Sequence, residues 1–78
     1  MRILKFYAQW CAPCKKLAKD FENENLRVES IDIEQEADMV DEYGIRSVPT
    51  TIILDENDKE IKRWVGTFNV KEIHNYLK

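Results

Sequence analysis

Trp10-Cys11-Ala12-Pro13-Cys14 is the most informative stretch of this 78-residue chain, because it holds two cysteines three positions apart. They are the chain's only cysteines. A bridge across so short a loop would constrain the unfolded chain only slightly, so it would add little to stability. The pair therefore indicates thiol chemistry rather than structural support.

The flanking residues place this pair at the junction of a strand and a helix. Residues 2–8 are almost continuously apolar, which is typical of a strand buried on both faces. Residues 11–23 repeat apolar side chains at helical spacing, and Pro13 suits the first turn of a helix. Cys11 then lies at a helix N-terminus, where free N–H groups and the dipole lower the pKa of a thiol. Its thiolate would attack a disulfide, and Cys14 could resolve the mixed disulfide.

The hydrophobic pattern of the rest of the chain predicts five further elements. They are a strand at 26–33, a helix at 35–43 that ends before Gly44, strands at 51–54 and 61–65 around a polar turn at 55–59, and a last helix that follows Asn69. The first strand–helix–strand unit implies a parallel strand pair. The sequence thus predicts one domain over 1–78 with the α/β order β-α-β-α-β-β-α, a four-stranded mixed sheet and helices on both faces.

The start of the last helix has its own signature. Asn69 and Glu72 have the spacing of a capping box, in which each side chain bonds the backbone of the other residue. Phe68, just before the cap, is placed to pack on Ile73 as a hydrophobic staple. His74 lies on this helix without an evident partner, and we expect no catalytic role for it.

Charge and composition exclude several classes of function. Twelve Lys and Arg against fifteen Asp and Glu give a net charge of −3, which predicts no binding to nucleic acid or to an anionic membrane. No apolar run approaches the roughly 20 residues of a membrane span, and the apolar start is too short for a signal peptide. We therefore expect a cytoplasmic monomer that does not bind membranes.

The other interpretations of the cysteines are weaker than thiol–disulfide chemistry. A zinc site needs about four ligands, and the chain offers two thiols and a distant histidine, so we expect no metal centre. Two thiolates alone could still hold Cu(I). The pair could also be two unreactive core cysteines.

Three segments, in the right order, resemble the thioredoxin family. Trp10-Cys11-Ala12-Pro13-Cys14-Lys15 is similar to that family's Trp-Cys-Gly-Pro-Cys-Lys motif, with one Gly-to-Ala change. Tyr43-Gly44-Ile45-Arg46-Ser47-Val48-Pro49-Thr50 resembles the segment that contains the family's cis-proline. Val65-Gly66 is similar to a Val-Gly pair that borders the family's substrate groove.

This resemblance implies a thiol–disulfide oxidoreductase that reduces protein disulfides through Cys11 and Cys14. It implies a cis peptide before Pro49, facing the cysteines, and a groove that pairs with an extended substrate segment. The residues expected to support substrate binding are Trp10, Ala12, Pro13, Val48, Pro49, Val65 and Gly66. Electrons would come from NADPH through a flavoprotein thioredoxin reductase; this chain would bind no cofactor, as it has no Gly-rich dinucleotide loop.

The chain also departs from the thioredoxin pattern. It begins at the motif-bearing strand and is as small as a glutaredoxin, so recycling by glutathione is the first alternative; a binding subunit without turnover is the second. Lys5 and Ser30 occupy the positions where thioredoxins usually carry a buried Asp and a Lys that pairs with it. Lys5 could reach solvent along its stem, or it could lie behind the cysteines and tune Cys14.

Overall fold

The computed structural model describes residues 1–77, and within them the order of elements is the predicted one. The elements are β1 (Arg2–Tyr7), α1 (Ala12–Asn23), β2 (Glu29–Asp32), α2 (Ala37–Tyr43), β3 (Thr50–Leu54), β4 (Glu60–Val65) and η1 (Val70–Asn75), a 3₁₀ helix. None of the helices in this described part is long and apolar enough to cross a membrane.

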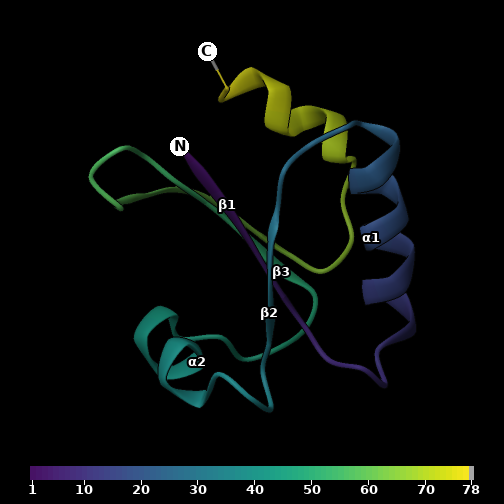
Figure 1. Cartoon of the computed structure of the whole chain (residues 1–78), viewed down its shortest axis with the longest axis vertical. Coiled ribbons are helices and arrows are strands. Elements are labelled where there is room, and N and C mark those ends of the chain that lie inside the picture. The colour runs from purple at the N-terminus through teal and green to yellow at the C-terminus, as the bar shows by residue number, and fades with distance from the viewer. Residues whose placement is uncertain (78) are drawn as a thin grey trace.

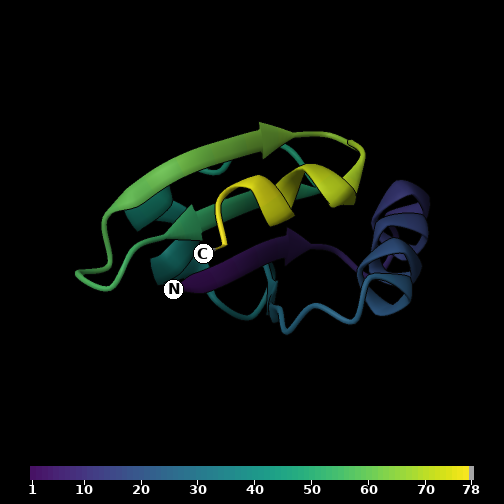
Figure 2. The same cartoon turned by 90° about the horizontal axis from the view of Figure 1, so that it is seen from above.

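The four strands form one mixed sheet in the order β2-β1-β3-β4. β1 runs parallel to β2 and antiparallel to β3, and β4 is antiparallel to β3. Figure 2 shows β1, β3 and β4 side by side, with the β3–β4 hairpin turn projecting at one end. The parallel pair is connected through α1, as the predicted strand–helix–strand unit requires.

Helices cover both faces of the sheet, so the predicted fold class is confirmed. Figure 1 shows α1 and η1 on one side of the strands and α2 on the other. Side chains alternate along β1: Ile3 packs with Leu17 of α1, whereas Leu4 and Phe6 belong to the cluster on the α2 side. All five residues of β3 are buried, as expected of a central strand covered on both faces.

For two elements the predicted first residue is wrong by more than one position. The strand predicted at 26–33 is reduced to β2, because the ladder with β1 begins only at the Leu4–Glu29 pair. The helix predicted at 35–43 begins at Ala37, because the preceding residues form a turn instead. The N–H groups of residues 35 and 36 both donate to the Asp32 carbonyl oxygen, at 3.1 and 2.9 Å.

The capping box predicted for the last helix is not formed. The Asn69 side chain accepts from the N–H of Lys71 at 3.1 Å, whereas a capping box needs the N–H of Glu72. That N–H donates to the Asn69 carbonyl oxygen at 3.0 Å, an i to i+3 bond of the kind that makes η1 a 3₁₀ helix. Phe68 stacks on Trp64, with ring centroids 4.4 Å apart, and joins the core cluster that contains the fully buried Ile73.

Candidate active site

Cys11, the first residue of the predicted helix, is the N-cap of α1, which begins one residue later at Ala12. The chain leaves β1 and turns sharply, and the Cys11 N–H donates to the Ala8 carbonyl oxygen at 3.1 Å. The Cys11 sulfur accepts the N–H of Cys14 at 3.2 Å. Pro13 lies between them in the first turn, where its missing N–H costs nothing. The sulfur of Cys11 therefore takes the place of a polar N-cap side chain.

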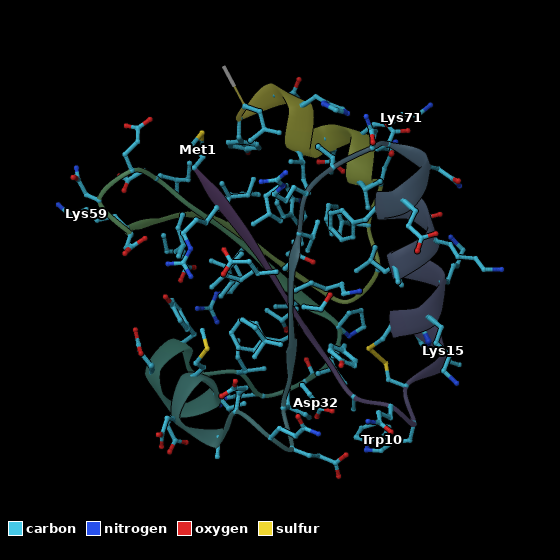
Figure 3. All side chains as sticks on the ribbon, in the orientation of Figure 1. Met1, Trp10, Lys15, Asp32, Lys59 and Lys71 are labelled. Atoms are coloured by element: carbon cyan, nitrogen blue, oxygen red, sulfur yellow. A yellow bond between two sulfur atoms is a disulfide. The ribbon has the colours of Figure 1, made fainter. Side chains whose placement is uncertain are left out.

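Cys11 and Cys14 form a disulfide, with their Cα atoms 5.3 Å apart. Both cysteines are buried, whereas Trp10 beside them is 69% exposed. Figure 3 shows the disulfide at the end of α1 near the labelled Trp10 and Lys15. In the reduced protein the Cys14 N–H and the positive end of the helix dipole favour a thiolate at Cys11. Ala12 is exposed in the same turn as Pro13.

The segment before β3 packs against the two cysteines. Val48, half-buried, packs against the cluster formed by Ala8, Cys11 and Cys14. The Val48–Pro49 peptide bond is cis, and Pro49 is buried. The structure thus brings together the two cysteines and the Val48–Pro49 segment, which lies more than 30 residues further along the chain.

The third predicted segment, Val65-Gly66, lies next to Pro49. Val65 is the cross-strand partner of Thr50, and the Gly66 N–H donates to the Pro49 carbonyl oxygen at 2.8 Å. Gly66 has a φ of +90°, a backbone conformation that residues other than glycine rarely adopt. Val65 is 67% exposed, so this corner presents an apolar side chain to solvent.

A groove of about 270 Å³ runs beside the cysteine loop. Trp10 and Val48, both predicted, are among its walls, together with Ile33, Val40, Ile45, Arg46 and Ser47. Sequence reasoning did not assign these last five residues to the site. Arg46 and Ser47 lie just before Pro49, within the segment 43–50 that resembles the family's cis-proline segment. Their closeness to Pro49 in the sequence could therefore have identified them as site residues. Ile33 and Val40 were interpreted only as apolar residues of a strand and a helix.

Asp32 is a supporting residue that sequence reasoning missed. It is buried at the end of β2, and its Oδ1 accepts the N–H of Glu34 at 2.9 Å. Its other oxygen, Oδ2, accepts from the Gln9 side chain at 3.4 Å. Asp32 therefore ties the turn after β2 to the residue just before Trp10. An Asp that bonds the N–H two residues further on is a recognisable turn signal, and it was available in the sequence.

Lys5 is buried on the α1 side of the sheet. It is 7% exposed, and within residues 1–77 its Nζ forms neither an ion pair nor a hydrogen bond. The ring centroid of Tyr7 lies 5.6 Å from this Nζ, and Ser30 is the cross-strand partner of Lys5. Burial lowers the pKa of Lys5, although the charge of Glu22 on α1 opposes that change.

Replacing Lys5 with methionine should stabilise the protein at neutral pH by about 1 kcal/mol, because it removes a partly desolvated charge that has no ion-pair or hydrogen-bond partner within residues 1–77. The lowered pKa means that the unfolded chain binds more protons between the folded pKa of Lys5 and its ordinary value of 10.5. The wild-type protein therefore gains stability as the pH rises through that window. Urea unfolding should show the advantage of K5M shrinking between neutral pH and about pH 10.

The matched control for this comparison is Lys19→Met, which removes the same charge from an exposed position of α1. We expect the unfolding free energy of K19M to stay within about 0.5 kcal/mol of the wild type at both pH values. A K5M protein that is less stable than the wild type at neutral pH would contradict the argument.

His74 has a partner in the structure, although none was evident in the sequence. Its Nε2 lies 3.0 Å from Oε1 of Glu24, which joins η1 to the end of α1. Glu24 also lines a hollow of about 470 Å³ between α1 and η1, which neither cysteine lines. No three His, Cys, Asp or Glu side chains within residues 1–77 are grouped so that they could hold a metal ion.

The fold and the site together define a class of protein. A disulfide between two cysteines three residues apart, at the N-terminus of a helix on a four-stranded mixed sheet, is the active-site arrangement of a thiol–disulfide oxidoreductase. The Thioredoxin family model matches residues 1–78. The chain belongs to the thioredoxin family, and the resemblance seen in the sequence is confirmed.

Individual relatives agree with this assignment. The chain is 35% identical to the SPbeta prophage-derived thioredoxin-like protein YosR of Bacillus subtilis over 100% of its own length and 96% of that protein. It is 33% identical to thioredoxin of Mycoplasmoides gallisepticum, over 97% of this chain and 80% of that one. Among solved structures, thioredoxin 1 of Thermosipho africanus superimposes with a TM-score of 0.75 at 32% identity, covering 96% of this chain and 88% of that chain.

Proposed function

We propose that this protein reduces disulfides in other proteins by dithiol exchange through its Cys-Ala-Pro-Cys motif. The observation that carries the proposal is the hydrogen bond from the Cys14 N–H to the Cys11 sulfur at the start of α1. That contact favours a thiolate at Cys11, the form that attacks disulfides. The exposed Trp10 and the adjoining groove provide a surface on which a protein substrate can lie.

The exchange takes place in two steps. The Cys11 thiolate attacks one sulfur of the substrate disulfide, forms a mixed disulfide and displaces the other sulfur as a thiolate, which takes a proton from water. Cys14 then loses its proton, and its thiolate attacks the Cys11 sulfur and releases the second substrate thiolate. The substrate gains two electrons, and the protein is left with the Cys11–Cys14 disulfide present in the structure.

Substrate binding uses the segment around Val48 and Pro49. An extended peptide can pair with backbone groups of this segment in the manner of an added strand. Apolar side chains of the peptide would contact Trp10, Ile33 and Val48 in the groove. Both cysteines are largely buried, which favours exposed, flexible disulfides as substrates.

The oxidised pair is recycled by electrons from NADPH, delivered by a flavoprotein thioredoxin reductase. The test measures NADPH consumption during reduction of a protein disulfide, with thioredoxin reductase in one assay and with glutathione and its reductase in another. We expect turnover with thioredoxin reductase and background rates with glutathione. Turnover with glutathione alone would replace the proposal with a glutaredoxin activity. Background rates in both assays would favour a binding subunit.

A further inference from the structure

A second hollow, of about 450 Å³, opens between β1 and the start of α1 and reaches Cys14 but not Cys11. Lys5 and Cys14 both line it, and its other walls are Tyr7, Ala8, Gln9, Lys15, Ala18 and Ser30. The two sulfurs of the active site therefore differ in their surroundings. Cys14 shares a hollow with a buried lysine, whereas Cys11 caps the helix.

Among residues 1–77, the walls of this hollow contain no carboxylate. The charged or titratable groups on β1 are Lys5 and Tyr7, α1 contributes Cys14 and Lys15, and β2 contributes only the neutral Ser30. Glu22 acts on Lys5 from further along α1 but does not line the hollow. Within the part of the chain that the structure describes, the ammonium of Lys5 thus lacks an adjacent counter-charge in the oxidised protein, and burial opposes its charged form.

The dithiol exchange produces a negative charge on Cys14, at the wall of this hollow. When a substrate is bound to Cys11 as a mixed disulfide, Cys14 must ionise before it can attack the Cys11 sulfur. The thiolate forms at a wall of the hollow that holds the Lys5 side chain. An opposite charge at close range favours an ionised group, most strongly where water is partly excluded.

We propose that Lys5 stabilises the Cys14 thiolate and so promotes the step that releases the substrate. The inference rests on the dithiol exchange proposed above. The proton of Cys14 passes to water, the Cys14–Cys11 bond forms and the Cys11–substrate bond breaks. Lys5 keeps its own proton throughout and contributes only its charge. It acts through Cys14 and touches no substrate atom.

The test follows the ionisation of Cys14 directly. In the Cys11→Ser protein Cys14 is the single thiol, and its rate of alkylation by iodoacetamide against pH reports the thiolate fraction. Adding Lys5→Met should move the midpoint of this profile upward by about one pH unit. Alkylation below the midpoint should then be about tenfold slower. An unchanged midpoint would overturn the inference.

Two further variants separate charge from structure. Lys5→Arg keeps a permanent positive charge that cannot act as a base, so its midpoint should stay close to that of Cys11→Ser alone. An arginine variant that shifts as far as K5M would overturn the proposal. Lys19→Met, which removes an exposed charge five residues from Cys14 on α1, should leave the midpoint in place; an equal shift there would also overturn it, since the effect would then belong to net charge.

The alkylation assay needs neither a reductase nor a protein substrate. An alkylation profile that K5M leaves unshifted would therefore rule out the proposed role of Lys5 without affecting the reductase proposal. Conversely, background turnover with thioredoxin reductase would remove the reductase proposal, and the shifted profile would still establish the electrostatic coupling of Lys5 and Cys14.

Discussion

Replacing Cys11 with serine should lower the rate of protein-disulfide reduction by on the order of a thousandfold or more, because the attacking sulfur is lost. The serine hydroxyl is of similar size and can still accept the N–H of Cys14, so the helix cap should persist. The fold should therefore survive while the chemistry is lost. NADPH consumption with thioredoxin reductase and a protein disulfide measures the effect.

Cys14→Ser is the matched control, since it removes the other sulfur of the same disulfide. This variant should attack a substrate and then stall, so that a mixed disulfide with Cys11 accumulates and is visible on a non-reducing gel. Cys11→Ser should give no such adduct. The opposite pattern would reverse the assigned roles, and a double Cys→Ser protein that keeps its biological function would establish a binding subunit.

The sequence predicted the position of the cysteines well because each local signal agreed with the fold. Pro13 and the apolar spacing of 11–23 located the helix to within one residue of α1. The nearly continuous apolar run at 2–8 indicated a strand covered on both faces, and β1 does contribute to both core clusters. These features depend on local geometry and on burial, which leave a direct trace in the pattern of residues.

The remaining features depend on tertiary contacts, which one sequence does not encode locally. β2 is short because its pairing with β1 begins only at Glu29 and ends at Asp32. The alternation of apolar and polar residues within 26–33 does not show where this pairing begins. The groove combines Trp10, Ile33, Val40 and residues 45–48, which lie in four separate segments. Ile33 and Val40 could therefore not be assigned to it from their own neighbourhoods. For Lys5 the sequence allowed either a solvated amine or one behind the cysteines, and only the structure places it in the hollow with Cys14.

Replacing Phe6 shows how much the core packing of β1, the strand that leads to the active site, contributes to the free energy of unfolding. Its side chain is fully buried on the α2 face, with its ring centroid 5.8 Å from that of Tyr43. It belongs to the cluster that includes Ile31 of β2 and Ile52 of β3, so its packing involves both strands that neighbour β1. A small domain has little other core to compensate for a cavity at this position.

Phe6→Ala should therefore lower the free energy of unfolding by about 3–5 kcal/mol, out of roughly 4–12 kcal/mol for a domain of this size. Urea unfolding followed by circular dichroism measures the loss, with Ile61→Ala as control. Ile61 is 44% exposed on β4, so its truncation should cost no more than about 1 kcal/mol. Equal losses of unfolding free energy in the two variants would contradict the assignment of Phe6 to the buried core and of Ile61 to the surface. Because β1 leads directly into the turn before Cys11, F6A should lose reductase activity at the same urea concentration at which it unfolds.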